Sequence, residues 1–517
     1  MGRFYVTTPI YYINAEPHLG HTYTTVIADT LARFHRAQGD DTFLVTGTDE
    51  HGDKIAASAA AAGVSPQAYA DRISPIFRQT WDACGFHYDH FVRTTDAQHE
   101  RLVQDFLSRV HANGDIYFSR YGGLYCTGCE RFLTEKELVD GRCPDHRTVP
   151  TLIEEENYFF RMTKYVDRVI AHLETDPEAI TPERYRNEVL AMLRGGALGD
   201  LCISRPKQRL QWGIELPFDR QYVTYVWFDA LISYVSGLQA HGDETFRALW
   251  PVAHHVIGKD ILKPHGVFWP TMLMALGLPL FKRLLVHGYW THGGNKMSKS
   301  LGNVIHPLEM KTRYGMETFR YFLLREMAFG QDADFNDATF VTRVNADLAN
   351  NLGNLVSRTL SMQQRYFNGE VQALGPATAD DAALIAAFTA AYREVPELTR
   401  ALAFHRALEA LWRAIDQANK YIVVTAPFTL AKDPAQRPRV GTILHHLLEA
   451  LHCAALLLAW FLPETSARIV DRLGVPLPAT LPAELAWGTH FAPGHRTQPP
   501  VVLFPRIETA PSAPAAS

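Results

Sequence analysis

The first fifty residues alternate between short apolar stretches and a longer amphipathic one. Residues 4–12, FYVTTPIYY, are β-branched and aromatic, which predicts a buried strand. Residues 21–39 carry apolar side chains at helical spacing and end on a glycine, so we expect a helix there. Residues 41–52, DTFLVTGTDEHG, predict a second strand, and an alanine-rich helix follows. Strand, helix and strand at this spacing predict a parallel sheet.

The same pattern divides the rest of the chain. Glycine, cysteine and turn residues dominate from residue 117, and strand-like stretches with polar carboxyl ends return at HHVIGKD and RLLVHGY. Residues 340–470 lack strand periodicity and are rich in alanine and leucine. We therefore expect an α/β domain split by an insert and followed by an all-α bundle. The expected boundaries are 1–116 and 222–290 for the α/β halves, 117–221 for the insert, 291–345 for a linking region with a loop, 346–480 for the bundle, and 481–517 for a tail that is partly packed and disordered at its end.

Composition limits the class of protein. A chain of 517 residues with 47% hydrophobic and 20% charged residues predicts a soluble protein of two to four domains. The net charge of −5 excludes an overall basic surface, so any nucleic acid must bind a local patch. We see no run of 18 apolar residues and no signal peptide, and we expect no membrane span. Six cysteines in this length argue against a disulfide framework, and a cytoplasmic location fits best.

Two short motifs carry phosphate-binding chemistry. In PHLGH, His18 and His21 share one face of a helix start, and Gly20 lets a flat ring approach the backbone. In KMSKS, two lysines and two serines lie on a glycine-flanked loop: Lys296, Ser298, Lys299 and Ser300. Taken alone, the first motif has the alternative of two ordinary helix-capping histidines, and the second that of a solvated surface turn. Because both follow strand ends of one split domain, we expect them to hold a triphosphate between them.

A third motif has metal-ligand spacing. Cys126, Cys129, Cys143 and His146 form a C-x2-C…C-x2-H pattern, which supplies four ligands for a closed, structural Zn²⁺ site. The alternative is a set of unlinked cysteines in a reducing cell. The isolated Cys84, Cys202 and Cys453 are expected to be core residues.

The order of these motifs, HLGH early and KMSKS late, resembles that of the class I aminoacyl-tRNA synthetases. Over nearly the whole chain, further stretches resemble the methionyl-tRNA synthetase family in its bacterial, single-knuckle form: FYVTTPIYYINAEPHLGH, VTGTDEHG, the cysteine pattern, YVWFDALISY, GKDI, HGYW and KMSKSLGN. The leucine, isoleucine and valine enzymes carry a large editing insert between the two motifs, whereas this chain has a small one. The cysteine enzyme is the closest rival in size.

The resemblance implies a fold and a reaction. The fold would be a Rossmann-like catalytic domain split by a zinc-knuckle insert and followed by an anticodon-binding helical bundle. The reaction would join methionine to ATP, with Mg²⁺ on the phosphates, and pass the methionyl group to tRNA(Met). The residues implied in ATP binding are His18, Gly20, His21, Gly258, Asp260, Lys296, Ser298, Lys299 and Ser300, of which the two histidines and two lysines would be catalytic.

The resemblance also implies the amino-acid site. Asp49 would bind the ammonium group by a charge-assisted hydrogen bond. The side-chain pocket would consist of Ile10, Tyr12, Trp227, Ala230, Leu231, Tyr234 and His287, because a thioether makes favourable contacts with aromatic rings. The alternative for each aromatic residue is a place in the core. For Asp260, which would bind the ribose hydroxyls, the alternative is a helix cap.

Three residues of the helical region would read the anticodon. On a helical wheel of residues 347–362, Leu348, Leu352, Leu355 and Thr359 cluster on one side, with Asn354 and Arg358 opposite. The third residue, Phe428, stands where the family usually has tryptophan, and it can still stack on an unpaired base. The alternative for the Asn/Arg pair is a solvated polar face.

Two rival functions remain from the sequence. One is another class I synthetase, most plausibly for cysteine, although the cysteines here lie in the insert rather than in a pocket. The other is a zinc-bearing, tRNA-binding protein without catalysis, against which the intact histidines and lysines of the two motifs argue. Because only a short tail follows residue 480, we expect a monomer without a C-terminal dimerisation domain.

Overall fold

The computed structural model describes residues 2–126, 131–133, 135–144, 147–297 and 303–508. Contacts divide the chain into two compact units. We call Arg3–Ala28 with Thr42–His287 the α/β unit, and Met1–Gly2, Asp29–Asp41 and Gly288–Ser517 the helical unit. Helix α1 (Leu19–Ala37) contributes its first half to the one and its second half to the other.

The α/β unit is built on a six-stranded sheet with the order β3-β2-β1-β12-β13-β7. The pairs β2–β3, β1–β12, β12–β13 and β13–β7 are parallel. Nearly every residue of β1 is buried, which explains why its sequence is continuously apolar rather than alternating. The strands are β1 (Arg3–Tyr12), β2 (Asp41–Asp49), β3 (His90–Arg93), β7 (Ile180–Thr181), β12 (Ala253–Gly258) and β13 (Arg283–His287). The predicted parallel α/β fold is confirmed.

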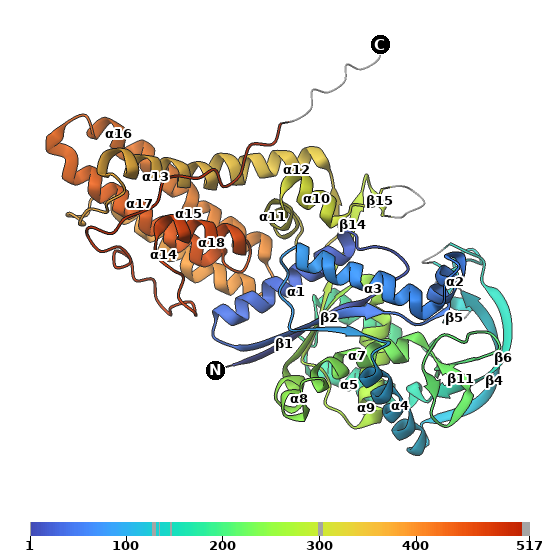
Figure 1. Ribbon diagram of the computed structural model, residues 1–517. Coiled ribbons are helices and arrows are strands. Elements are labelled where there is room, and N and C mark those ends of the chain that lie inside the picture. The colour runs from blue at the N-terminus through green and yellow to red at the C-terminus, as the bar shows by residue number, and fades with distance from the viewer. Residues whose placement is uncertain (1, 127–130, 134, 145–146, 298–302, 509–517) are drawn as a thin grey trace, which may run out of the picture. The chain divides into compact units, whose positions relative to one another are not determined.

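Helices follow these strands along the chain (Figure 1), and most of them contribute buried side chains to one large core. They are α2 (Asp53–Ala61), α3 (Pro66–Ala83), α4 (Ala97–Ala112), α7 (Val226–Gln239), α8 (Asp243–Leu249), a π-helical turn Pro264–Phe268, and α9 (Trp269–Leu276). Helix α7 is buried on almost all sides, so only its ends and a few positions are accessible.

Residues between β3 and β12 form two smaller antiparallel sheets. One has the order β5-β4-β6-β8, with β4 (Ile116–Cys126), β5 (Arg131–Leu133), β6 (Thr151–Phe160) and β8 (Leu201–Cys202). The other has the order β10-β11-β9, with β9 (Ser204–Pro206), β10 (Glu215–Leu216) and β11 (Asp219–Thr224). Helices α5 (Val166–Thr175) and α6 (Glu183–Arg194) lie between β6 and β8 in the chain, and β7, which lies between these two helices, pairs at the edge of the main sheet.

The helical unit begins with a small sheet, β15-β14-β16, formed by β14 (Trp290–His292), β15 (Asn295–Lys296) and β16 (Ala333–Phe335). The helices are α10 (Pro307–Tyr314), α11 (Met316–Glu326), α12 (Asp337–Arg343), α13 (Asn354–Phe367), α14 (Ala379–Arg400), α15 (Phe404–Thr425), α16 (Pro427–Leu430), α17 (Arg437–Leu458) and α18 (Pro463–Leu473). This confirms the predicted all-α region.

One buried carboxylate joins three helices of this unit. Asp381 completes a capping box with Thr378 at the start of α14. Its oxygens also accept hydrogen bonds from Arg439 of α17 and Tyr421 of α15. These partners outweigh the effect of burial and hold the pKa of Asp381 well below its usual range.

The tail after α18 packs along the bundle (Figure 1). The Tyr392 hydroxyl donates to the Pro482 carbonyl at 2.6 Å, and the Glu449 carboxylate binds the His490 ring at 2.6 Å. Further along, Arg468 donates to the carbonyl of Leu503 at 3.0 Å. The predicted packed part of the tail therefore docks on helices, and residues 509–517, where disorder was expected, lie outside the described residues.

Within the described ranges, one helix meets the length and composition of a membrane span, Pro434–Leu458. Its whole apolar window is buried in the protein. Burial of this kind is what a core helix of a bundle shows, and the absence of a membrane span stays a prediction.

A buried ion pair fastens the second half of α1 within the helical unit. Arg320 Nη1 of α11 lies 2.5 Å from Asp29 Oδ2, and both side chains are nearly inaccessible to solvent. Arg33 contacts the same carboxylate at 2.9 Å, and Arg320 also donates to the carbonyl of Phe461 at 2.6 Å. A buried cation with these partners depends on its carboxylate for compensation.

Replacing Asp29 by asparagine should therefore destabilise the protein by about 3–5 kcal/mol, because Arg320 would stay buried without its counter-charge. Arg320→Met should cost less, since it removes the charge together with its hydrogen-bonding demand. Urea unfolding followed by circular dichroism measures both. The matched control is Asp243→Asn, which removes an exposed partner of Arg247 and should change stability little. Equal losses for Asp29→Asn and Asp243→Asn would contradict the prediction.

Candidate functional site

The candidate residues of the α/β unit gather at the carboxyl edge of the main sheet. Strand β1 ends at Tyr12, β2 at Asp49, β12 at Gly258 and β13 at His287. Gly258 and His287 are direct neighbours in the parallel ladder, and the Ile13 amide donates to the Asp49 carbonyl at 3.3 Å. In open parallel sheets ligands bind outside this edge, so the geometry is that of a small-molecule site.

The histidines of PHLGH lie where β1 passes into α1. The rings of His18 and His21 stack with their centroids 3.8 Å apart. The Gly20 amide donates to His18 Nδ1 at 3.0 Å, and the His18 amide donates to His21 Nδ1 at 3.3 Å. Because each Nδ1 accepts a hydrogen bond, the neutral rings carry their proton on Nε2, which can donate a hydrogen bond to a phosphate oxygen. Burial, with His18 beside it, lowers the pKa of His21 well below its usual value, which favours this neutral form.

Gly258 and Asp260 mark the adjoining strand end. A β-carbon at Gly258 would lie 2.6 Å from Asp260 Oδ1 and 3.5 Å from His287 Cε1, so a larger residue would displace one of them. Asp260 is exposed in the short 3₁₀ turn Lys259–Ile261. An accessible carboxylate at this position can accept hydrogen bonds from sugar hydroxyls.

The proposed pocket residues of α7 share one face of that helix. Trp227, Ala230, Leu231 and Tyr234 follow a spacing of three and four residues, and Trp227 is the most accessible of them. Tyr234 is held within the core: its hydroxyl donates to His265 Nε2 at 2.6 Å, because His265 Nδ1 donates to the Ile261 carbonyl, and its ring stacks on His255. Burial raises the pKa of Tyr234, as do Tyr11 and Asp49, so this phenol lies within the field of the Asp49 carboxylate.

The remaining pocket residues come from strand ends. Ile10 is buried, and Tyr12 is half-buried with the Lys54 ammonium 5.5 Å from its ring centre. His287 Nε2 lies 2.7 Å from the Thr24 hydroxyl of α1. Tyr23 meets the same imidazole edge-on. These contacts tie the end of β13 to the helix that PHLGH begins.

The KMSKS segment is described only in part. Strand β15 pairs with β14 in a tight hairpin whose turn, Gly293–Gly294, has positive φ at both residues. The Asp334 carboxylate accepts hydrogen bonds from Thr291 Oγ1 and the Gly294 amide, which fixes this turn. The backbone of Lys296 ends β15, whereas Ser298, Lys299 and Ser300 lie outside the described residues. The segment belongs to the helical unit and PHLGH to the α/β unit.

Two of the four expected zinc ligands are described. Cys126 and Cys143 are each 1% exposed and share a small buried cluster with Leu133. Cys129 and His146 lie outside the described residues. Among the residues that the structure does describe, no group of three or more histidine, cysteine or acidic side chains is arranged to hold a metal.

The expected anticodon residues lie on helical segments of the helical unit. Leu348, Leu352, Leu355 and Thr359 are fully buried, as the wheel predicted. Asn354 is exposed, Arg358 is half-buried, and Phe428 of α16 is 47% exposed. The wheel assumed α-helical geometry throughout, and this was wrong for Val344–Gly353, which forms a π-helix. A β-carbon at Gly353 would lie 2.9 Å from the Leu348 carbonyl, so glycine permits the wider turn.

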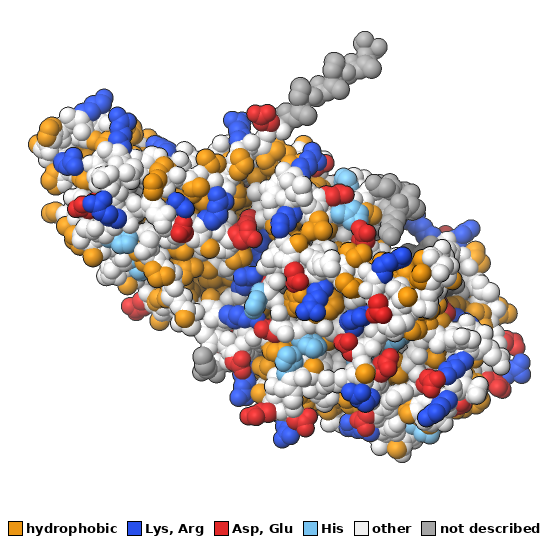
Figure 2. Space-filling model, in the orientation of Figure 1, with side chains coloured by type: hydrophobic (Ala, Val, Ile, Leu, Met, Phe, Trp, Pro, Cys, Tyr) orange, Lys and Arg blue, Asp and Glu red, His pale blue; other side chains and the backbone are white. Residues whose placement is uncertain are grey.

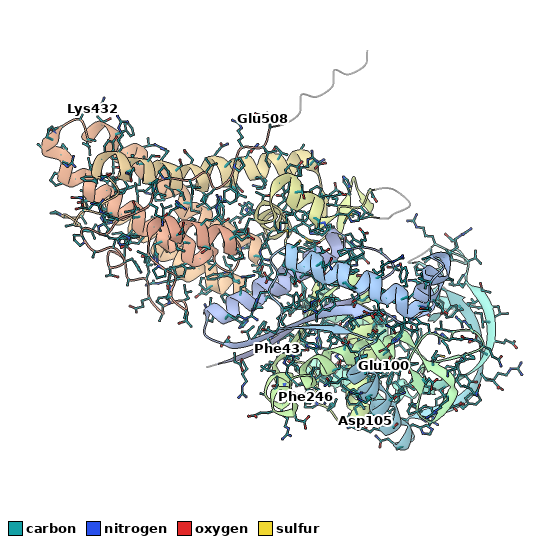
Figure 3. The ribbon with its side chains drawn as sticks, in the orientation of Figure 1. Phe43, Glu100, Asp105, Phe246, Lys432 and Glu508 are labelled. Carbon is teal, nitrogen blue, oxygen red and sulfur yellow. The ribbon has the colours of Figure 1, made fainter. Side chains whose placement is uncertain are left out.

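The tail adds residues to this region that the sequence did not suggest. A hollow of about 410 Å³ is lined by Asn350, Gly353, Asn354 and Ser357 on one side and by residues 502–504 of the tail on the other. Near Phe428, Val423 and Val424 are also exposed, and Lys420 and Lys432 are accessible. Figure 2 shows basic side chains beside apolar ones over α16, and Figure 3 labels Lys432 there. Apolar and basic groups side by side suit an unpaired nucleic-acid strand.

Sequence reasoning also missed the charged residues behind the sheet edge. Asp229 is the one charged residue of α7, and it contacts His51 and His99 at 2.7 Å each. Glu50, next to Asp49, is fully buried and paired with Arg93. The sequence feature that could have revealed these residues is the single carboxylate within an otherwise apolar helix, because a charge of this kind is buried only when it has partners.

Comparison with known proteins finds family matches over nearly the whole chain. Residues 4–149 and 146–360 match the family described as tRNA synthetases class I (M), and residues 371–514 match the anticodon binding domain of methionyl tRNA ligase. The methionine–tRNA ligase of Deinococcus radiodurans is 45% identical over 98% of this chain and 75% of its own length. That of Mycobacterium bovis is 42% identical over 98% of both chains.

A solved structure shows the same similarity. The chain is similar to Mycobacterium tuberculosis methionyl-tRNA synthetase in complex with methionyl-adenylate, with a TM-score of 0.92, 42% identity, and coverage of 98% of this chain and 100% of the other. The family model and the relatives together cover the sheet, the insert and the helical bundle. The chain therefore belongs to the methionyl-tRNA synthetase family of class I tRNA synthetases.

Proposed function

We propose that this protein is a methionine–tRNA ligase. It activates methionine with ATP to methionyl-adenylate and transfers the methionyl group to the 3′ end of tRNA(Met), for initiation and elongation of protein synthesis. The observation that carries the proposal is the 42% identity, over 98% of the chain, to a synthetase solved in complex with methionyl-adenylate. A soluble enzyme of translation is expected in the cytoplasm.

The first step is an in-line displacement at phosphorus. A carboxylate oxygen of methionine attacks the α-phosphorus of ATP, the bond to the β-phosphate oxygen breaks, and pyrophosphate leaves with the electron pair. In our proposal His18 and His21 donate through Nε2 to the phosphates, while Gly20 and Gly258 leave room for the nucleotide. Asp260 accepts from the ribose, and Lys296, Ser298, Lys299 and Ser300 stabilise the leaving pyrophosphate. Mg²⁺ arrives with ATP and neutralises part of the phosphate charge.

The second step is acyl transfer. A hydroxyl of the terminal tRNA ribose attacks the carbonyl carbon of the adenylate, the bond from that carbon to the phosphate oxygen breaks, and AMP leaves with the electron pair while the hydroxyl proton passes to the phosphate or to water. In this proposal Asp49, a largely buried carboxylate at the end of β2, holds the methionine ammonium throughout both steps. The thioether is held by Ile10, Tyr12, Trp227, Ala230, Leu231, Tyr234 and His287. No side chain has to form a covalent bond in this sequence.

The proposed function predicts which amino acid drives exchange. With each of the twenty amino acids in turn, the purified protein should exchange labelled pyrophosphate into ATP with methionine and only weakly with the others. A hydrophobic pocket discriminates by about 10–200-fold per missing methylene, so small aliphatic amino acids should be poor substrates. Preferential exchange with cysteine would support the rival synthetase, and no exchange with any amino acid would support a binding protein without catalysis.

We further propose one structural zinc ion in the insert, held by Cys126, Cys129, Cys143 and His146. The two described members of this ligand set are compatible with a shared ion. Cys126 ends strand β4 and Cys143 lies in a loop, yet both belong to one buried cluster. Four such ligands fill a tetrahedral ion, which supports the fold and leaves no position for a substrate.

Elemental analysis should find about one zinc per chain in protein purified without chelator. Cys143→Ser should lower that content and expose the insert to proteolysis, because the ion contributes directly to local folding. Cys202→Ser is the matched control, since Cys202 lies in the same region on β8 and is not part of the ligand set. Fully folded wild-type protein without zinc would remove the metal from the proposal.

We also propose that Asn354, Arg358 and Phe428 contact the anticodon. Their support is the match of residues 371–514 to an anticodon-binding domain and the exposure of Phe428 beside basic residues. Aromatic stacking contributes about 1–3 kcal/mol per base, so phenylalanine can supply much of what tryptophan would.

Phe428→Ala should raise the KM for tRNA(Met) in aminoacylation by about tenfold or more and leave tRNA-independent pyrophosphate exchange unchanged. Phe428→Trp should keep or improve tRNA use, and Arg358→Ala should behave like Phe428→Ala. Val64→Ala provides a control at an exposed apolar position of the α/β unit, outside the proposed anticodon surface. If the alanine variants lost exchange as much as aminoacylation, these residues would support the fold and the assignment would fail.

A further inference from the structure

Helix α7 carries one carboxylate, and two buried histidines hold it. Asp229 Oδ2 lies 2.7 Å from His51 Nδ1, and Asp229 Oδ1 lies 2.7 Å from His99 Nε2. The other ring nitrogen of His99 lies 2.8 Å from the Ser236 hydroxyl, two helical turns further along α7. All three ionisable side chains are at most 4% exposed. We call His51, Asp229 and His99 the buried triad.

The pKa shifts of Asp229 and His51 both favour the charged forms of these two groups. Burial acts to raise the pKa of Asp229, yet His51 and His99 together bring it below its usual value. Burial acts to lower the pKa of His51, yet Asp229, Glu100 and Glu50 bring it above its usual value. Glu100 comes from the same helix as His99 and is labelled on α4 in Figure 3. A buried charge-assisted pair of this kind has a narrow range of favourable geometry, so it fixes the elements that carry it.

One end of the triad lies in the turn that carries Asp49. His51 follows Asp49 by two residues. Glu50 lies between them, and its carboxylate, its amide and its carbonyl all form hydrogen bonds. Its carboxylate binds Arg93 at 2.8 and 2.9 Å, its amide donates to Thr94 Oγ1, and its carbonyl accepts from Trp212 Nε1 at 2.6 Å. The Trp212 ring also packs on the His51 ring, with centroids 5.1 Å apart. The turn therefore has little freedom to move independently of the triad.

The other end of the triad lies in the pocket helix. Asp229 is two residues after Trp227 and directly before Ala230, both of which we assign to the thioether pocket. Asp229 and Ser236 lie on one side of α7, and His99 contacts both, so α4 sets the rotation of α7 about its axis. The triad thus joins the strand end that presents Asp49 to the helix that presents the pocket.

We propose that Asp229, held by His51 and His99, is a positioning residue that sets the separation of Asp49 from the thioether pocket and so couples recognition of the ammonium group to recognition of the side chain. This rests on the proposed function and deepens it. Methionine carries both groups at a fixed spacing, and a ligand that bridges two rigidly spaced sites binds more tightly than its parts do separately. A purely structural role would instead affect folding without affecting this coupling.

Ligands that carry only one of the two recognised groups distinguish a positioning role of Asp229 from a purely structural role. The compound 4-(methylthio)butanoate has the thioether without the ammonium, and 2-aminobutanoate has the ammonium without the thioether. In His99→Gln and Asp229→Asn, the KM for methionine in pyrophosphate exchange should rise about tenfold, as for the loss of a hydrogen bond to a charged group. The KM for ATP and the inhibition constants of the two partial ligands should change by less than about threefold, because each subsite alone stays intact.

Three further variants distinguish an effect through the triad from a general loss of stability. Val103→Ala is the matched control, since Val103 lies on α4 one turn after His99, is fully buried in the core and has no polar side-chain atom with which to bind Asp229. Ser236→Ala removes only the outer contact of His99 and should give a smaller rise in the methionine KM. In the double variant His51→Gln/His99→Gln, the effects on the methionine KM should be non-additive, because both histidines act through one carboxylate.

The outcomes are distinct. Additive effects in the double variant, a parallel loss of affinity for both partial ligands, or an equal rise in the methionine KM for Val103→Ala would each overturn the proposal. Wild-type exchange driven by another amino acid would instead overturn the proposed function, and the same variants assayed with that amino acid would still show whether its two ends are coupled. Thermal unfolding of every variant confirms that folded protein is compared.

Discussion

The parallel hydrogen-bonded ladder of the main sheet determines where everything else in the α/β unit lies. Because β1, β12 and β13 run in the same direction, their carboxyl ends meet at one edge, and Tyr12, Gly258 and His287 come together there although they are far apart in the chain. The helix that follows β1 begins at the same edge, so the stacked His18 and His21 are placed beside them. A different strand order would separate these residues without changing any local structure.

Buried charges then hold this edge in shape. Asp49 ends β2 at this edge and is largely buried, and the two residues that follow it are held by ion pairs: Glu50 by Arg93, and His51 by Asp229. Such groups are costly to bury alone and specific once paired, so they define the positions of the elements that carry them. The same logic recurs in the helical unit, where Asp29 with Arg320 and Asp381 with Arg439 join separate helices.

In the helical unit, a local departure from regular α-helical geometry also affects where residues lie. The π-helix Val344–Gly353 widens the backbone just before α13, and π-helical turns frequently accompany functional sites. The docked tail places residues 502–504 beside the same segment, so Asn354 lies at the rim of a hollow made by two distant parts of the sequence. Figure 2 shows acidic and basic side chains interspersed over the α/β unit, which agrees with a nucleic-acid surface confined to a patch.

The sequence by itself indicated the first strands and helices of the α/β unit, the order of an α/β region before an all-α region, and the family, because hydrophobic periodicity and short motifs are local properties of the sequence. The burial of Leu348, Leu352, Leu355 and Thr359 followed from that periodicity alone. Only the tertiary structure showed that His51, His99 and Asp229 meet, since their partnership depends on three elements far apart in sequence packing around one carboxylate. The tertiary structure also showed the π-helix and the helices on which the tail packs. Both depend on what a backbone segment packs against rather than on the preferences of its own residues.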